Sequence, residues 1–558
     1  MVLEPLFFEL LNTKQSRRKG KYAEDDIYKQ IPYLNGGLFS PHTDDHYKYD
    51  RVNQCGTFGL VTIPDDWFVR LYTVLDQYNF TVDENTSYDI ELSIDPEMLG
   101  RIFENLLAEI NPETGENAKK STGSFYTPRD IVDYMVDSSL LEYLKDKTGI
   151  EEIKLRALIS YSKEDDHLAV FDNQEKKKII NALYTVTILD PACGSGAFPI
   201  GMLQKIVYIL QEIDPDANLW FDKATENVSI LIKKEFEKKF NAGSLDYIRK
   251  LSVIQNSIFG VDIQPIAVEI ARLRCFLSLI IEEIVNDNEP NRGVNPLPNL
   301  DFKFVIANSL IKLEGSTGSY QMSLFEDQEH IKKLQEVREL YFRVEDADEK
   351  KDLKDEFKDI QQSMLLTTIS NYDKQASKLY QSLSEWKPFS NEPTAWFDPE
   401  WMFGIKNGFD VVIGNPPYIQ LQKSIDATHK TKVGDMYEKC GYDTFAKTGD
   451  IYCLFYEKGL NLLKDNGILT YITSNKWMRA GYGKNLRRFL SKHNPVNLID
   501  FAGQKVFESA TVDVNILLCQ KSKNQGKTLA CTANNLCKNN LSVFVQQYSE
   551  KISFNSYD

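Results

Sequence analysis

The alternation of strand-like and helix-like segments is the feature that most constrains how this chain folds. Short runs rich in β-branched residues recur along the chain, and longer amphipathic segments such as FPIGMLQKIVYILQEI (198–213) separate them. The runs lie at 186–190, 258–262, 302–307, 409–414, 467–473, 497–501 and 513–519. A helix between two strands returns the chain to the edge where the first strand began, so consecutive strands run parallel. The sequence therefore predicts an α/β fold.

Breaks in this alternation divide the chain into parts. An N-terminal region is predicted to be mainly helical, because 96–110 places apolar residues at helical spacing. The stretch 325–360 is dense in charge, with apolar residues at helical intervals, which predicts a helical hairpin inserted into the α/β core. The predicted parts are an N-terminal domain (1–120), the first half of the core (121–310), the inserted hairpin (311–400), the second half of the core (401–520) and a C-terminal tail (521–558) with little pattern.

The charge balance argues against a protein that binds nucleic acid through its overall charge. The formal net charge is −16 and the pI is about 5.1. A local basic surface is still compatible with DNA binding, because only the contacted face must be positive. Two basic clusters stand out, at 14–21 and 476–492, and each is read either as a solvated face or as a phosphate-binding surface. The second cluster contains Lys476, Arg479, Lys484, Arg487 and Arg488.

Several other classes of protein are disfavoured by composition. No apolar run reaches the roughly 18 residues that a membrane span needs. At the N-terminus the basic residues follow the apolar stretch, which is the reverse of a signal peptide. The cysteines form no C-x-x-C pair, so neither a zinc site nor a disulfide framework is indicated. We expect a cytoplasmic protein without a structural metal.

The first motif with chemical meaning is DPACGSGAF, at 190–198. A predicted strand ends in Asp190, and a turn with Gly194 and Gly196 leads into a helix. Glycines let a backbone approach a ligand closely, and an acid at the carboxyl end of a strand faces the ligand crevice. The acid would repel a pyrophosphate but attract an ammonium or sulfonium group. The alternative is a simple turn between strand and helix.

The second motif is FGVD, at 259–262, where another predicted strand ends in an acid. An acidic side chain at the end of the second strand can accept from both hydroxyls of a ribose. Asp262 can equally well cap the helix that begins near Pro265, and the sequence leaves both interpretations open.

The third motif, NPPY at 415–418, is the most specific one in the chain. Two prolines remove two backbone donors and fix φ, so the segment is rigid and its carbonyl groups remain able to accept. The Asn415 amide oxygen and the Pro416 carbonyl can together accept from one NH2 group, which turns the lone pair of that nitrogen toward an electrophile. Tyr418 offers a flat face for stacking on a base. The alternative is a rigid turn without chemistry.

These motifs, in this order after Phe125-Tyr-Thr-Pro, resemble those of the γ-class DNA adenine-N6 methyltransferases that use S-adenosylmethionine. The resemblance spans about 90–520 and is greatest to the methyltransferase part of type IIG restriction–modification enzymes. It implies a Rossmann-like methyltransferase sheet, with the cofactor-binding half at 121–310 and the catalytic half at 401–520. It also implies a site-specific, adenine-specific DNA methyltransferase with S-adenosyl-L-methionine as cofactor and double-stranded DNA as partner.

The resemblance further implies roles for individual residues. Thr127 and Asp190 would contact the methionine part of the cofactor and Asp262 its ribose, while Asn308 stands where the family usually has an acid that meets the cofactor adenine. Tyr418 and Phe507 would hold the flipped base between them. The implied cofactor-binding set is Thr127, Asp190, Ala192, Gly194, Gly196, Asp262 and Asn308, and the implied catalytic set is Asn415, Pro416, Pro417 and Tyr418.

Parts of such enzymes are not evident in the sequence. A target-recognition domain usually follows the last of these motifs, and a nuclease with clustered acids precedes the methyltransferase. Neither is visible here, so a separate or missing recognition segment and nuclease are expected as partners. One alternative is a catalytically incomplete fragment that binds cofactor and DNA without turnover. Another is a methyltransferase that acts on protein glutamine or on guanine N2 of ribosomal RNA, since NPPY also occurs there.

Overall fold

The structure of the chain is a computed structural model. It describes residues 5–34, 48–50, 55–57, 64–77, 79–80, 93–94, 126–162, 167–226, 230–313, 328–370, 381–422, 432–507, 512–533 and 541–554. The helix predicted at 96–110 lies outside these described residues.

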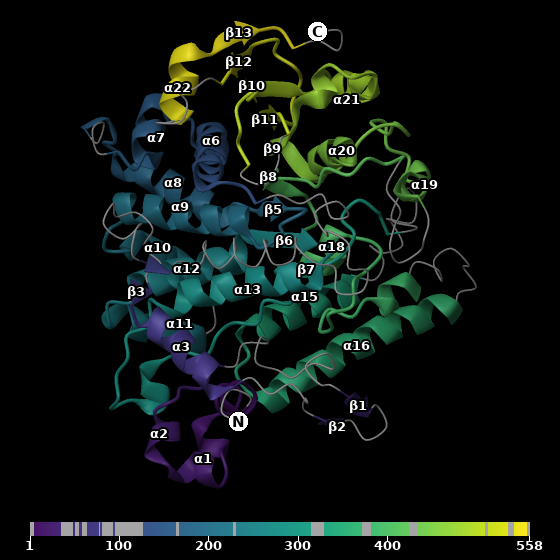
Figure 1. Cartoon of the computed structure of the whole chain (residues 1–558). Helices are drawn as coiled ribbons and strands as arrows, with labels where there is room; N and C mark the ends of the chain where they lie inside the picture. The colour runs from purple at the N-terminus through teal and green to yellow at the C-terminus, as the bar shows by residue number, and fades with distance from the viewer. Residues whose placement is uncertain are drawn as a thin grey trace.

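A nine-stranded sheet forms the centre of the molecule, in the order β7-β6-β5-β8-β9-β11-β10-β12-β13 (Figure 1). The five strands β7, β6, β5, β8 and β9 run parallel to one another, and β12 runs parallel to β10. In contrast, β11 runs antiparallel to both β9 and β10, and β13 runs antiparallel to β12. The strands are β5 (Ile188–Asp190), β6 (Ile258–Asp262), β7 (Phe304–Ile306), β8 (Phe409–Gly414), β9 (Leu463–Ser474), β10 (Asn494–Asp500), β11 (Val514–Gln520), β12 (Thr528–Thr532) and β13 (Glu550–Ile552). Each run that the sequence analysis identified as a strand is one, and the predicted Rossmann-like sheet is confirmed.

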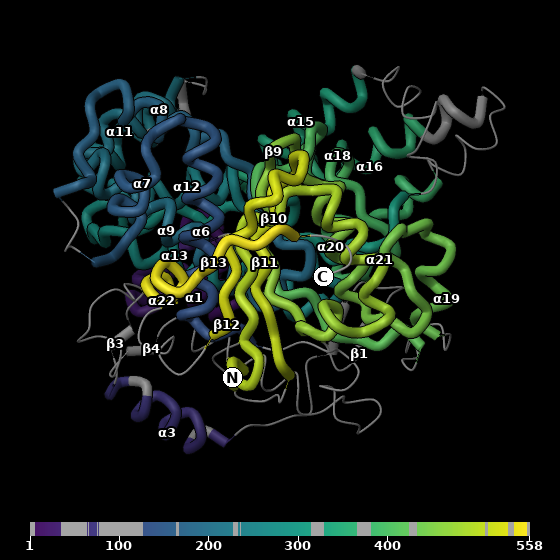
Figure 2. The backbone as a smooth tube through the Cα atoms, turned by 90° about the horizontal axis from the view of Figure 1, so that it is seen from above, coloured from purple at the N-terminus to yellow at the C-terminus, as the bar shows by residue number. Residues whose placement is uncertain are grey.

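Helices cover both faces of this sheet, as the view from above in Figure 2 shows. One layer contains α6 (Arg129–Thr148), α7 (Glu152–Ile159), α8 (Asn173–Thr185), α9 (Ala197–Ile213), α10 (Asn218–Thr225), α11 (Ile230–Asn241), α12 (Leu245–Asn256) and α13 (Pro265–Ile280). The other contains α15 (Gln328–Arg343), α16 (Ala347–Ser370), α18 (Pro399–Phe403), α19 (Val433–Glu438), α20 (Tyr452–Leu462) and α21 (Lys484–Leu490).

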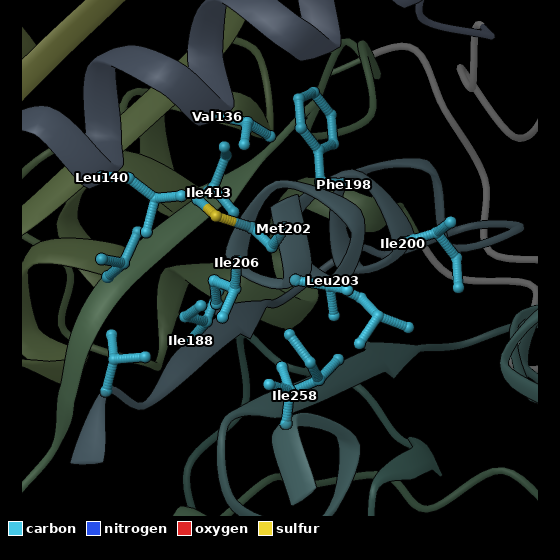
Figure 3. Packing of buried hydrophobic residues seen from close by; sticks show 14 of the residues in the cluster. Val136, Leu140, Ile188, Phe198, Ile200, Met202, Leu203, Ile206, Ile258 and Ile413 are labelled. Carbon is cyan, nitrogen blue, oxygen red and sulfur yellow. The ribbon is translucent and has the colours of Figure 1, made fainter. Parts of the chain in front are cut away.

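The two-residue period of the strands divides the core between these layers. Ile188 and Val411 pack with side chains of α6 and α9, as Figure 3 shows for Ile188. Their neighbours Leu189 and Val412 point to the opposite face and pack with α18 and α20. Because both faces are covered there, the central strands β5, β7 and β8 are buried along their whole length and mainly apolar instead of alternating with polar residues. Full burial stabilises each such side chain by about 1.5–3 kcal/mol relative to exposure.

The described N-terminal segments are short and include strands that the sequence analysis did not predict. They comprise a π-helix (Pro5–Leu10), α1 (Lys21–Glu24), α2 (Asp26–Lys29), β1 (Lys48–Asp50), β2 (Cys55–Thr57), α3 (Asp65–Leu75), β3 (Asn79–Phe80) and β4 (Ser93–Ile94). The first basic cluster has a structural use here. Arg18 donates to the carbonyls of Leu10 and Tyr28, and Arg17 pairs with Asp346 and Asp348 beside α16.

Two regions lie where the alternation of strands and helices breaks. Helices α15 and α16 lie in the predicted helical insertion, contact each other and pack through Tyr341 and Phe357 on Phe302. After residue 520, where the sequence showed little pattern, the strands β12 and β13 extend the sheet, and α22 (Leu541–Tyr548) connects them. The strand β12 is short and has no clear pattern of apolar residues. It forms because Leu529 pairs with β10 and Thr528 donates to the Pro495 carbonyl, contacts that the local sequence does not encode. Among the described residues, no helix combines the length and apolar character needed to cross a membrane.

Candidate active site at the carboxyl edge of the sheet

The strand order places a crevice at the carboxyl ends of β5 and β8. From β5 the chain passes through β6 to β7 on one side and then crosses to β8 on the other side of β5. The loops that follow β5 and β8 therefore lead in opposite directions, and this switch point is where open α/β sheets bind their ligands. Asp190 is the last residue of β5, and Asn415 follows Gly414, the last residue of β8.

Asp190 is a buried carboxyl group whose hydrogen bonding is incomplete within the described part of the chain. Its side chain is 1% exposed, and Oδ1 accepts from the Ala192 backbone N–H at 3.1 Å. Oδ2 is buried without a hydrogen-bond partner among the described residues. Burial, with a smaller contribution from the nearby Asp262, raises the pKa of Asp190 well above its ordinary value. Because a buried unpaired carboxyl is unfavourable, this environment suits a cationic ligand group.

Glycines make room for this carboxyl group. Gly194 and Gly196 have φ values of +51° and +85°, which L side chains rarely adopt. A Cβ on Gly414 would lie 2.6 Å from Asp190 Oδ1, so the end of β8 approaches the acid as closely as it does because no side chain intervenes. The tight turn predicted after the first strand is therefore present.

Asp262, at the end of β6, is bonded to the same turn. Its Oδ2 accepts from the Gly194 N–H and its Oδ1 from the Gln264 N–H, each at 2.9 Å. Burial raises the pKa of Asp262, while these backbone N–H groups act in the opposite direction. Gln264 is the N-cap residue of α13 and no side chain caps this helix, so the capping interpretation of Asp262 is wrong: its bond to Gln264 closes a turn before the helix. Each carboxylate oxygen retains a second lone pair, so a ribose contact stays a prediction.

The NPPY segment begins where β8 ends. The side chain of Asn415 is half-buried, and its Nδ2 donates to the Thr127 hydroxyl oxygen at 3.1 Å. Pro416 is buried behind it. Tyr418 donates to the Ile472 carbonyl of β9 at 3.4 Å. The structure therefore brings Thr127, Asp190 and Asn415 to one edge of the sheet, as the sequence analysis predicted.

Tyr418 and Phe507 lie together but do not form the predicted open sandwich. Their ring centroids are 6.4 Å apart with an interplanar angle of 59°. That distance is typical of two rings in direct contact, about 4.5–7 Å, whereas a base between them would separate the rings by roughly two stacking distances. Phe507 is 1% exposed, so its ring fills the space that the base would need. Stacking of a base on both rings requires that they separate.

Comparison with known proteins agrees with this arrangement. The family model described as "Eco57I restriction-modification methylase" matches residues 256–507. This part of the chain is therefore similar to the restriction–modification methylases. The match includes Asp262, the NPPY segment and Phe507.

Curated relatives carry names from the same class. The putative type II restriction enzyme and methyltransferase RM.MjaORFECS2P of Methanocaldococcus jannaschii is 28% identical over 94% of this chain and 45% of its own length. The type II restriction enzyme and methyltransferase RM.Eco57I of Escherichia coli is 34% identical over 21% of this chain and 11% of its own length. The chain thus spans less than half of the length of these relatives.

The chain also resembles solved structures of larger restriction–modification enzymes. The type IIL enzyme MmeI in complex with DNA aligns with a TM-score of 0.49 at 13% identity, over 99% of this chain and 51% of that chain. The type ISP enzyme LlaBIII bound to DNA aligns with a TM-score of 0.42 at 14% identity, over 99% of this chain and 30% of that chain.

Asn308, which follows β7, has partners that the sequence did not indicate. Its Nδ2 donates to the Tyr437 hydroxyl at 3.1 Å, and its Oδ1 accepts from the Leu310 N–H at 3.1 Å. The amide is buried and braces the turn after β7. The Tyr437 hydroxyl also lies 3.5 Å from Oδ1, and a contact between Asn308 and the adenine of a cofactor stays a prediction.

A cavity of about 200 Å³ opens beside Tyr418, the last residue of the NPPY segment. Its lining combines an aromatic ring, an acid, a cation and hydroxyl groups, in Tyr418, Asp450, Lys476, Ser474 and Tyr482. Sequence reasoning did not assign a role to Asp450 or Tyr482. The tripeptide Gly449-Asp450-Ile451 pairs with the segment after Tyr418, since Ile419 N–H donates to Asp450 Oδ1 at 2.9 Å. Only the fold reveals this pairing.

The acid of this cavity yields a prediction about stability. Burial raises the pKa of Asp450 to about 7, although Lys476 and the backbone N–H groups of Ile419, Tyr452 and Ile451 act to lower it. A carboxyl whose pKa is higher in the folded state binds its proton more tightly there, so its favourable contribution is complete below about pH 4 and is lost as pH rises through about 7. The free energy of unfolding of Asp450→Asn, relative to wild type, should increase by about 1–3 kcal/mol between pH 4 and pH 8. Denaturant titrations of both proteins at three pH values measure this change. A difference in the free energy of unfolding that does not depend on pH would contradict the raised pKa of Asp450.

The second basic cluster follows β9 at the same edge of the sheet, as predicted. Lys476, Arg479, Lys484 and Arg488 are exposed. Arg487 differs, because its guanidinium donates to the carbonyls of Trp477 and Ala480 and so stabilises the turn before α21. Both bonds use Nη1, so the assignment of Arg487 to DNA phosphate stays a prediction that concerns its Nη2 and Nε donors.

Proposed function

We propose that this chain transfers a methyl group from S-adenosyl-L-methionine to N6 of adenine in double-stranded DNA, as the modification part of a restriction–modification system. The observation that carries the proposal is the position of NPPY: it begins at the carboxyl end of β8, beside the buried Asp190 at the end of β5. An acceptor pair for an exocyclic amine thus lies next to an acid suited to a cationic ligand. The methylase family match supports the same reaction class.

The cofactor fits the residues that are present. The orphaned Oδ2 of Asp190 is a ready acceptor for an ammonium group, and the glycine turn lets a ligand contact the backbone. We assign Asp190, Gly194, Gly196 and Asp262 to its binding, and Thr127 lies at the same edge in contact with Asn415. When bound, the cofactor supplies an electrophilic methyl group on sulfonium.

The protein contributes orientation and electrostatics to the transfer. The target adenine is rotated out of the duplex at a cost of a few kcal/mol. Asn415 Oδ1 and the Pro416 carbonyl then accept from its N6 amine, which directs the nitrogen lone pair away from the ring plane. The stacking face of Tyr418 holds the base, worth about 1–3 kcal/mol once Phe507 has moved aside. Holding the reacting atoms in this geometry lowers the barrier without a covalent intermediate.

A methyl-transfer assay with labelled cofactor tests the proposal. The protein is incubated with double-stranded DNA, with total RNA and with a protein substrate that presents glutamine, and the DNA is digested to nucleosides. We expect label in DNA, recovered as N6-methyladenine. Label in RNA guanine or in protein instead would favour the other NPPY enzymes, and cofactor binding without transfer to any of the three would favour a fragment that does not turn over. We place the reaction where the DNA is, in the cytoplasm.

DNA binding is proposed to use the exposed members of the second basic cluster. Lys484 opens α21 and Arg488 lies one turn further on, both at the edge of the sheet that contains NPPY. Replacing either by alanine should weaken binding to DNA of any sequence and reduce the salt slope by about 1, because one phosphate contact releases about one counterion. Fluorescence anisotropy at several salt concentrations measures this. Lys351→Ala, an exposed lysine of α16, is the matched control, and an equal loss there would mean that only net charge matters.

A further inference from the structure

Thr127 and Asn415 are joined directly, although 288 positions separate them in the chain. Asn415 Nδ2 donates to Thr127 Oγ1 at 3.1 Å, and Thr127 is 4% exposed. The sequence analysis assigned Thr127 to the cofactor alone. In the structure its hydroxyl oxygen instead contacts the amide that the proposed reaction depends on.

In the structure this bond anchors the Asn415 amide with Nδ2 toward Thr127 and Oδ1 away from it. The terminal torsion of an asparagine side chain is broad and roughly two-fold, so packing alone leaves the NH2 and oxygen ends nearly interchangeable. With Nδ2 held by Thr127, Oδ1 is the end that remains to accept from a substrate amine. The reversed amide would present its own NH2 group to that amine, and two donors would then face each other.

Thr127 is well placed to fix that orientation, because it precedes a rigid helix. Pro128 follows it with φ −57° and caps α6. The helix is bonded to the sheet, where Ser139 Oγ donates to Thr470 Oγ1 of β9 at 2.8 Å. Further along, Asn497 Nδ2 of β10 donates to the Tyr134 hydroxyl at 2.7 Å. The hydroxyl therefore has a fixed position relative to β8 and its following loop.

We propose that Thr127 is a positioning residue that sets the orientation of the Asn415 amide for methyl transfer. The proposal rests on the proposed function, because it names a determinant of that same reaction. It assigns the hydroxyl group, and not merely the volume of the side chain, to this role. It also links the segment before α6, which borders the cofactor side of the crevice, to the loop that receives the base.

The test compares Thr127→Val, which keeps the shape and removes the hydroxyl, with Thr127→Ser, which keeps the hydroxyl. We expect kcat of Thr127→Val to fall by about 10- to 100-fold, as a small misplacement of a reacting group does. KM for DNA and the calorimetric Kd for S-adenosyl-L-methionine should change by less than about threefold, since the lost interaction serves the transition state. Thr127→Ser should recover kcat to within a few-fold of wild type. In the Asn415→Ala background, Thr127→Val should cause no further loss.

Control variants separate this role from folding. Thr148→Val removes a buried hydroxyl at the far end of α6, where it donates to the Leu144 carbonyl, and should leave kcat unchanged. Thr127→Ala replaces Thr127→Val if the valine variant does not fold, with the same expectation. Unchanged kcat, or a loss of cofactor affinity that accounts for the whole effect, would overturn the proposal. Absence of methyl transfer to DNA by the wild-type chain would instead overturn the proposed function itself, so the two failures are distinct.

Discussion

Replacement of Asn415 by alanine is expected to lower the rate of methyl transfer by about 10²- to 10³-fold or more. The amide oxygen interacts most strongly with the amine as positive charge develops on the nitrogen, and removal of one such preorganised partner typically costs about 3–4 kcal/mol of transition-state stabilisation. Cofactor affinity should stay within a few-fold of wild type, because Asp190 and the glycine turn are untouched. Single-turnover transfer from labelled cofactor and calorimetric titration measure the two quantities separately.

The matched control for this variant is Asn485→Ala. Asn485 is an exposed asparagine of α21 whose Nδ2 donates to the Phe445 carbonyl, so it tests the loss of an asparagine bond near the same edge. Its transfer rate should equal that of wild type. A less than tenfold loss in Asn415→Ala would exclude Asn415 as the amine acceptor, and equal losses in both variants would point to a general disturbance of the edge.

The fold and the central motifs were predictable because they are local. β-branched runs and helical spacing fix each element, and the carboxyl ends of parallel strands meet at one edge, so Asp190, Asp262 and Asn415 were expected to lie close together. The tail after residue 520 was not predictable, since β12 exists through its pairing with β10 and not through its own pattern. Short edge strands are generally decided by such tertiary contacts.

The side-chain contacts within the site could not be predicted from the sequence either, because they join segments that are far apart in the chain. These contacts are the bond between Thr127 and Asn415, the bond from the Ile419 N–H to Asp450, and the ring contact between Tyr418 and Phe507. A sequence motif predicts which residue types lie at the end of a strand, but it does not predict which rotamer each side chain adopts. The internal use of Arg487 illustrates the same point, because spacing alone does not distinguish a phosphate-binding arginine from one that caps carbonyls.

Two buried aspartates on neighbouring strands provide the second large expected effect. Asp190 ends β5 at the site edge, where one of its oxygens lacks a hydrogen-bond partner among the described residues. Asp410, near the start of β8 at the opposite edge, is 3% exposed and fully engaged. It accepts from Lys464 Nζ at 2.6 Å and from the backbone N–H and hydroxyl of Thr187 at 3.0 and 2.9 Å. The same change to asparagine should therefore act in opposite ways.

Asp190→Asn should leave the ligand-free protein at least as stable as wild type, because it removes a carboxyl group that burial disfavours in its charged form. It should weaken binding of S-adenosyl-L-methionine by about 10- to 150-fold, equivalent to the 1.5–3 kcal/mol of a charge-assisted hydrogen bond. Asp410→Asn should lower the free energy of unfolding by about 1–3 kcal/mol, since it weakens a largely buried ion pair, and should leave cofactor affinity unchanged. Denaturant titration measures the free energy of unfolding of each variant, and calorimetry measures its affinity for the cofactor. If both variants lose stability and neither loses affinity, Asp190 is a structural residue like Asp410, and the carboxyl edge of β5 does not bind the cofactor.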